Sequence, residues 1–166
     1  MTMALSTKFT TLVNKLQASP SDPMLKHDLL KCLPEMKALA KVNPWALFCL
    51  AQVYPQTSPQ YLHMMTKSAD SGCTNAMLAA AIVLLKSASS GDVKKAARYV
   101  QQIRQSNDSY IIGLGESLVE NSPILAKELK NQARSNTEIK KSCGFFAKQT
   151  EKEVVDPVVA QQGLNA

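Results

Sequence analysis

Aromatic side chains are scarce in this chain of 166 residues, where they make up 5% of the sequence, and charged side chains account for only 19%. No alternating run of Val, Ile and Thr occurs before the last residues, so no segment there has the pattern of a β-strand. Ala, Leu, Lys, Ser and Gln are abundant instead, and this mixture suits close-packed helices better than sheets. We therefore expect an all-α fold, and the chain is long enough for one domain with a real core.

Long apolar runs are missing too, since no stretch approaches the roughly 18 residues that a membrane-spanning helix needs. The N-terminus lacks the apolar segment of a signal peptide, and without arginine it is a poor transit peptide. We expect a cytoplasmic protein without a transmembrane segment. Secretion or translocation without a cleavable signal stays open as an alternative.

The four cysteines lie far apart, with no CxxC motif and no Cys/His cluster: Cys32, Cys49, Cys73 and Cys143. This spacing argues against a zinc site and against a compact disulfide framework. Three of them lie in or beside apolar helical runs, where free cysteine behaves as a small buried hydrophobic residue. That usage is typical of a reducing compartment.

Catalytic motifs are absent as well. Gly113 and Gly115 do not form a dinucleotide-binding loop, because no strand precedes them and the third glycine is missing; close helix packing is the simpler interpretation. His63, one of two histidines, has no cysteine or carboxylate at ligand spacing. We expect no catalytic residue, no metal site and no cofactor, and hence a protein that is not an enzyme. A tight cluster of Cys, His and carboxylate in the folded chain would reopen that question.

Helix-start signals recur, each a capping side chain followed by a proline that suits the first helical position. They stand at Asp22-Pro23, Asn43-Pro44, Ser58-Pro59 and Ser122-Pro123. Together with apolar residues at helical spacing, they predict helices at about 6–18, 23–42, 45–54, 58–71, 75–87, 92–105, 109–120, 122–134 and 138–149. The total is about eight or nine helices. Pro34 is expected to kink or restart the second helix, and residues 135–137 to restart the last.

These segments predict a single helical-repeat domain at 6–150, with its clearest repeats at 43–120. Residues 1–5 are expected to fray. Residues 151–166 have no helical period and contain a proline, so we expect a flexible tail.

The predicted helix starts are regularly spaced. First-helix caps at Asn43, Thr74 and Asp108 lie 31 and 34 residues apart, and second-helix caps at positions 58, 92 and 122 lie 34 and 30 apart. A period of this length with two helices in each unit is typical of an α-solenoid of stacked antiparallel helix pairs. Each pair cannot bury its apolar face alone, so the stack supplies the core.

Small and large residues recur at matching places in these pairs. The set comprises Ala46, Leu50, Ala51, Tyr54, Tyr61, Ala69, Gly72, Ala76, Lys95, Ala96 and Tyr99. The pattern resembles the Sel-one-like repeats, which are close relatives of the tetratricopeptide repeats. In that resemblance, Lys67 to Gly72 form the joint between two repeats, with one substitution from the usual Lys-Ala-Ala at Ser68. We expect Gly72 to reverse the chain with a positive φ.

The resemblance implies a scaffold or adaptor that binds a protein partner in a groove lined by the first helix of each pair. It also fits regulation of a partner enzyme, and repeats of this kind are frequent among bacterial adaptors and translocated effectors. The candidate partner-binding residues are Trp45, Gln52, Asn75 and Tyr110. An uncapped terminal helix pair would also allow stacking on a second copy, which leaves a homodimer open.

The alternative function is basic-surface binding to nucleic acid or to an anionic membrane. The net charge is +6, and Lys94, Lys95 and Arg98 are a candidate basic face. The interleaved aromatic residues that stack on bases are largely absent, so we favour a protein partner, either an enzyme or an acidic surface, over nucleic acid. Salt distinguishes the two functions, because binding to a polyanion weakens steeply as salt rises.

Overall fold

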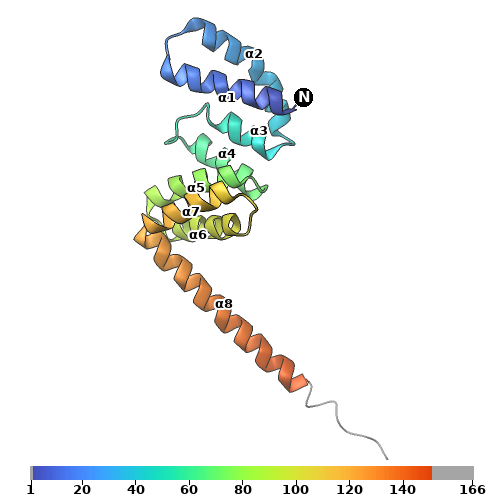
Figure 1. Cartoon of the computed structure of the whole chain (residues 1–166), viewed down its shortest axis with the longest axis vertical. Coiled ribbons are helices and arrows are strands. Elements are labelled where there is room, and N and C mark those ends of the chain that lie inside the picture. The colour runs from blue at the N-terminus through green and yellow to red at the C-terminus, as the bar shows by residue number, and fades with distance from the viewer. Residues whose placement is uncertain (1, 151–166) are drawn as a thin grey trace, which may run out of the picture. The chain divides into compact units, whose positions relative to one another are not determined.

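The computed structural model describes the backbone of residues 2–150 and the side chains of residues 3–138. Within that range the chain forms eight helices and no strand (Figure 1), which confirms the expected all-α class. The helices are α1 (Thr2–Ala18), α2 (Pro23–Ala40), α3 (Pro44–Ala51), α4 (Pro59–Asp70), α5 (Thr74–Ser87), α6 (Ser90–Arg104), α7 (Ser109–Glu120) and α8 (Pro123–Thr150).

Contacts within the chain divide it into two compact units, Met1–Glu128 and Leu129–Ala166. The boundary falls inside α8. The first unit holds α1 to α7 and the start of α8, and it contains every site discussed below. The predicted tail, 151–166, and the side chain of Cys143 lie outside the described residues.

Four of the predicted caps start their helices through side-chain hydrogen bonds. Asp22 accepts from the N–H groups of residues 24 and 25, and Asn43 accepts from those of residues 45 and 46. Ser58 and Asp108 each accept from the N–H three residues ahead. Such bonds satisfy backbone donors that have no partner inside the helix, so these four starts are fixed locally.

Two predicted caps are wrong. The N-cap of α5 is Cys73 rather than Thr74, and the N-cap of α6 is Ser89 rather than Asp92. The carboxylate of Asp92 instead accepts a short hydrogen bond from the hydroxyl of Ser87, while its N–H donates to the Ser89 hydroxyl. Asp92 therefore supports the first turn of α6 from inside the helix.

The joint between α4 and α5 explains the shift to Cys73. Gly72 has φ +98°, as expected, and its N–H donates to the carbonyl of Ala69. The N–H of Cys73 donates to the carbonyl of Ser68. These two bonds form a Schellman motif, in which a residue with positive φ closes the helix end. Cys73 thus both completes the C-terminal motif of α4 and serves as the N-cap of α5.

The expected helix 45–54 is shorter in the structure, where α3 ends at Ala51. The N–H groups of Gln52, Val53 and Tyr54 each donate to a carbonyl three residues earlier, so the chain tightens into a 3₁₀-type turn. Pro55 follows, and the residue before a proline is disfavoured in the α conformation. Tyr54, expected at a packing position, is therefore exposed.

Three other expectations about helix bounds also differ. Helix α1 begins at Thr2 instead of near residue 6. Helix α2 is continuous through Pro34, so it does not restart there. Helix α8 runs unbroken from Pro123 to Thr150 instead of restarting at 135–137. The hydroxyls of Ser135 and Thr137 donate to carbonyls four residues earlier, which satisfies these side chains inside the helix.

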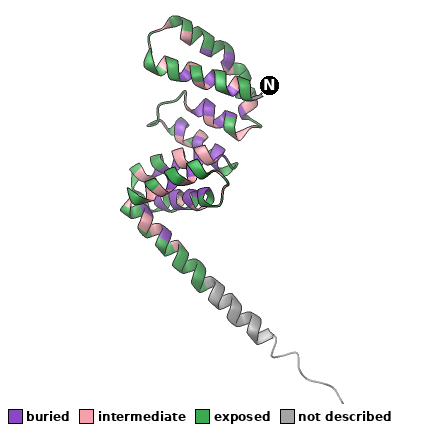
Figure 2. Cartoon of the chain, in the orientation of Figure 1, coloured by how far each residue is buried: buried purple, intermediate pink, exposed green. Residues whose placement is uncertain are grey.

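In the first unit, each helix from α1 to α6 contacts the next helix along the chain. Contacts also join α1 to α3, α3 to α5, and α5 to α7, so the odd-numbered helices form a continuous row. Buried residues occur on every helix from α1 to α7 (Figure 2). Fully buried large side chains, such as Phe9, Met36, Met65, Tyr99 and Ile103, fill the interior.

Alanines allow the close approach of these helices. The alanines with no exposed surface are Ala46, Ala51, Ala76, Ala80, Ala81, Ala96 and Ala97. A methyl side chain lets two helix backbones come nearer than a branched one does, and the large residues then fill the gaps between them. Most positions selected from the repeat pattern are accordingly core positions.

Candidate functional site

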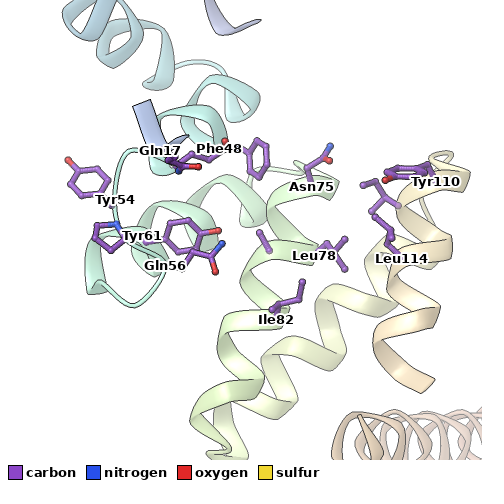
Figure 3. Close-up of a pocket in the computed structure, with 14 residues that line it drawn as sticks. Gln17, Phe48, Tyr54, Gln56, Tyr61, Asn75, Leu78, Ile82, Tyr110 and Leu114 are labelled. Atoms are coloured by element: carbon purple, nitrogen blue, oxygen red, sulfur yellow. The ribbon is translucent and has the colours of Figure 1, made fainter. Parts of the chain in front are cut away.

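The row of odd-numbered helices carries a cavity of about 410 Å³ (Figure 3). Its lining comes from α1, α3, the α3–α4 connection, α4, α5 and α7. The lining residues are Gln17, Phe48, Gln52, Tyr54, Pro55, Gln56, Tyr61, Asn75, Leu78, Ala79, Ile82, Tyr110, Ile111 and Leu114.

Helical spacing explains why these side chains meet. On α5, residues 75, 78, 79 and 82 lie three or four apart and so share one face. On α7, residues 110, 111 and 114 also share a face. Gln52, the C-cap of α3, follows Phe48 by four residues. Leu78 and Leu114 point toward each other from α5 and α7 (Figure 3).

A second cavity of about 380 Å³ adjoins the first. It is lined by Val13, Leu16, Gln17, Pro20, Leu29, Gln52 and Val53. Gln17 and Gln52 line both cavities, so the two are neighbouring parts of one surface. We call the larger one the tyrosine cavity, the smaller one the aliphatic cavity, and the two together the groove.

The lining of the groove is uncharged. It offers primary amides, phenol hydroxyls and apolar surface, but no Asp, Glu, Lys, Arg or His. A tyrosine hydroxyl is protonated at neutral pH and can donate a hydrogen bond, and burial raises the pKa of Tyr61 still further above its ordinary value. The groove is thus equipped for hydrogen bonding and apolar contact, and it has no group suited to proton transfer near neutral pH.

Three of the four candidate partner-binding residues, Gln52, Asn75 and Tyr110, line the tyrosine cavity. Tyr110 is its most exposed large hydrophobic side chain, at 73%. Trp45 is not part of the lining. It packs on Phe48, with ring centroids 5.1 Å apart, and Phe48 does line the cavity.

The apolar lining was not singled out from the sequence. Ile82 on α5 and Leu114 on α7 are each 40% exposed, although both are large apolar residues. The available signal was their spacing, since Leu78 and Ile82 follow Asn75 at helical intervals and Leu114 follows Tyr110. Recognising it required knowing that α5 and α7 lie side by side.

The candidate basic face is partly neutralised in the structure. Lys95 Nζ lies 3.9 Å and Arg98 3.2 Å from the carboxylate of Asp70, and both cations lie over the ring of Tyr99. Lys94 is exposed on the same helix. With two of its three cations engaged by one carboxylate, we do not propose this face as a nucleic-acid or membrane site.

The remaining candidate chemistry lies in buried thiols. Cys32, Cys49 and Cys73 are free and buried, and burial raises the pKa of Cys49 above its ordinary value, which disfavours the reactive thiolate. In the part of the chain that the structure describes, no group of three or more His, Cys, Asp or Glu could hold a metal ion.

The positions selected from the repeat pattern divide into two groups. Alanines 46, 51, 69, 76 and 96 are buried together with Leu50, Tyr61 and Tyr99, whereas Tyr54, Gly72 and Lys95 are not. Tyr54 and Tyr61 also line the tyrosine cavity, so these two tyrosines of the pattern lie at the candidate site.

None of the described helices is long and apolar enough to cross a membrane. No protein-family model, curated protein or solved structure matches the chain. Function is therefore inferred from the groove itself.

Proposed function

We propose that this protein is an interaction module that binds a partner protein along the groove, acting as an adaptor or as a regulator of a partner enzyme. The observation that carries the proposal is the joining of residues from α1, α3, α5 and α7 into one uncharged surface. Sites that combine apolar area with a few placed polar groups are typical of recognition.

We also propose that α1 to α7 form a short α-solenoid of the Sel-one-like kind. Contacts of α1 with α3, α3 with α5 and α5 with α7 support it, since stacked pairs place their first helices in a row. The observed caps keep the regularity: those at 43, 73 and 108 lie 30 and 35 residues apart, and those at 58 and 89 lie 31 apart.

Exposed apolar side chains in the groove favour a binding role over a purely structural one. Val53, Ile82, Tyr110 and Leu114 are between 39% and 73% exposed and lie on the groove. Apolar surface that gathers on one face, with polar groups among it, commonly marks an interaction site.

The test is affinity purification of the tagged full chain from its native cell, followed by mass spectrometry. Leu114→Asp places a charge in the groove, and Leu30→Asp is the matched control, because Leu30 is 64% exposed on α2 and lines neither cavity. We expect a stoichiometric protein partner with the wild type and the control, but not with Leu114→Asp. Circular dichroism checks that both variants keep their helices.

A partner that binds Leu114→Asp as well as the wild type would show that the groove is not the binding surface. Recovery of no protein partner, together with turnover of a small substrate by the purified chain, would contradict the proposal altogether.

A further inference from the structure

The two cavities of the groove differ in chemistry. Three tyrosines and several amides line the tyrosine cavity, whereas the aliphatic cavity has five apolar residues among its seven. Gln17 and Gln52 lie where the two meet. A ligand that follows the groove therefore meets an apolar cavity, a pair of amides, and a second, more polar cavity in that order.

Charge limits what this surface accepts. The chain has 19 Lys and Arg and 13 Asp and Glu, yet none of them lines either cavity. A charged group bound there would lose water without gaining an ion partner, which is costly. The complementary occupant is uncharged over the length that the groove covers.

The two shared amides match a peptide main chain. Each primary amide offers two donor hydrogens and a carbonyl acceptor, which is the complement of a peptide N–H and C=O. An extended segment leaves its main-chain groups open to such bonds and directs successive side chains to opposite sides. Its backbone can then lie over Gln17 and Gln52 while side chains on either side of that point enter the two cavities.

The extent of the groove favours a chain over a compact small molecule. The lining reaches from Val13 on α1 to Leu114 on α7. Each cavity on its own has the volume of a small-molecule pocket, but the two share Gln17 and Gln52 in their linings. A ligand that fills only one cavity would leave the exposed apolar surface of the other uncovered.

We infer that the groove binds an extended, uncharged peptide segment of its partner, with one bulky aliphatic side chain in the aliphatic cavity and a second apolar or aromatic side chain in the tyrosine cavity. This inference rests on the proposed function and narrows it to one class of partner.

The test is selection of a phage-displayed random library of twelve-residue peptides on the immobilised full chain. Enriched peptides should share two apolar positions with no charged residue between them. A synthetic fluorescent copy of the enriched sequence is then titrated by anisotropy. Its affinity should change by less than about threefold between 50 and 500 mM salt, because no phosphate-like charge pairing is involved.

Four variants locate the peptide. Val53→Asp in the aliphatic cavity and Leu114→Asp in the tyrosine cavity should each weaken binding by at least about tenfold, and Leu30→Asp should not. Val53 is 39% exposed and follows the end of α3, so the change is tolerable for folding. Gln17→Leu, at an exposed position, roughly keeps the size of the side chain but removes its amide, and it should weaken peptide binding by about tenfold.

The inference is overturned if enriched peptides are acidic or basic, if binding falls steeply with salt, if either groove variant binds normally, or if no peptide is enriched. Its failure differs from that of the proposed function. A partner that co-purifies in a Leu114-dependent manner while no peptide is selected would mean that the groove receives a folded surface.

Discussion

The hydroxyl of Tyr99 donates a 2.8 Å hydrogen bond to Oδ1 of Asp70, a residue 29 positions earlier. Tyr99 is fully buried on α6, and Asp70 is the last residue of α4. The same carboxylate faces Lys95 and Arg98. An acidic residue at a helix C-terminus is unfavourable next to the helix dipole. The hydrogen bonds from Tyr99 and Arg98 and the ion pair with Lys95 compensate for the position of Asp70 and join α4 to α6.

Replacing Tyr99 by Phe should destabilise the protein by about 1 kcal/mol, because the ring still fills the core while the hydrogen bond is lost. The half-exposed carboxylate keeps its two cations and water, which limits the cost. Urea unfolding followed by circular dichroism measures the change. Tyr110→Phe, at a 73% exposed position, is the control and should be nearly neutral. Equal midpoints for the two variants would contradict this account.

Two turn residues, one a glycine and one an alanine, have a positive φ and allow opposite tests of backbone strain. Gly72 has φ +98° and Ala88 has φ +54°, and a Cβ added at Gly72 would meet no atom within 4 Å. Any effect of Gly72→Ala therefore comes from the backbone, and we expect the free energy of unfolding to fall by roughly 1–2 kcal/mol. Ala88→Gly removes such strain, which stabilises the folded chain, but it also adds conformational freedom to the unfolded chain, which offsets part of that effect. We therefore expect the free energy of unfolding to rise by about 0.5–1 kcal/mol.

Thermal and urea unfolding of both variants check these opposite signs. A loss of stability in Ala88→Gly would show that the left-handed residue is not strained, and an unchanged Gly72→Ala would place the joint in an ordinary conformation.

Alanine substitutions at Gly113 and Gly115, both on α7, distinguish the effect of helix propensity from the effect of packing. A Cβ at Gly113 would meet nothing, whereas one at Gly115 would lie 3.3 Å from Cγ2 of Ile103. Gly113→Ala should stabilise the protein by about 0.5–1 kcal/mol through helix propensity. Gly115→Ala gains the same helix propensity, but its new methyl group must displace the side chain of Ile103, which is fully buried. The Gly115→Ala protein should therefore be at least about 1 kcal/mol less stable than the Gly113→Ala protein.

Comparison of the unfolding midpoints of these two variants measures the cost of the contact between residue 115 and Ile103. If they are equal, Gly115 is not required for the close contact of α7 with α6, and the packing interpretation of this glycine fails.

Acid should release the link between α6 and α7. Arg104 donates two hydrogen bonds, of 2.6 and 2.9 Å, to the carboxylate of Glu116. These bonds lower the pKa of Glu116 below its ordinary value. A lowered folded-state pKa adds stability above the unfolded pKa, and that stability is lost as pH falls through the folded pKa. The pair is about two-fifths exposed, so the effect should stay below about 1 kcal/mol.

Carboxyl titration by NMR measures this pKa in the wild type and in Arg104→Gln. We expect the pKa of Glu116 to rise in Arg104→Gln, and the loss of stability as pH falls below the ordinary pKa of glutamate to become shallower in Glu116→Gln. An unchanged pKa in Arg104→Gln would mean that the pair does not form in solution.

Residue type and spacing along the chain are enough to predict the all-α class and most helix starts. Asp22, Asn43, Ser58 and Asp108 cap helices through bonds to N–H groups two or three residues away, and Gly72 closes α4 through its own φ. These are local interactions, so residue type and spacing suffice to predict them. Local competition also explains the errors: Ser89 displaced Asp92 as a cap, and the hydroxyls of Ser135 and Thr137 were satisfied without breaking α8.

The packing of the helices determines which exposed residues lie together on one surface. Gln52, Asn75 and Tyr110 were selectable from the sequence, but their shared cavity with Phe48, Ile82 and Leu114 depends on α3, α5 and α7 lying in one row. Likewise, Lys95 and Arg98 resemble a free basic face until α6 packs beside α4 and brings them to Asp70. Contacts across such separations depend on packing of whole helices, which the order of residues within any one helix does not specify.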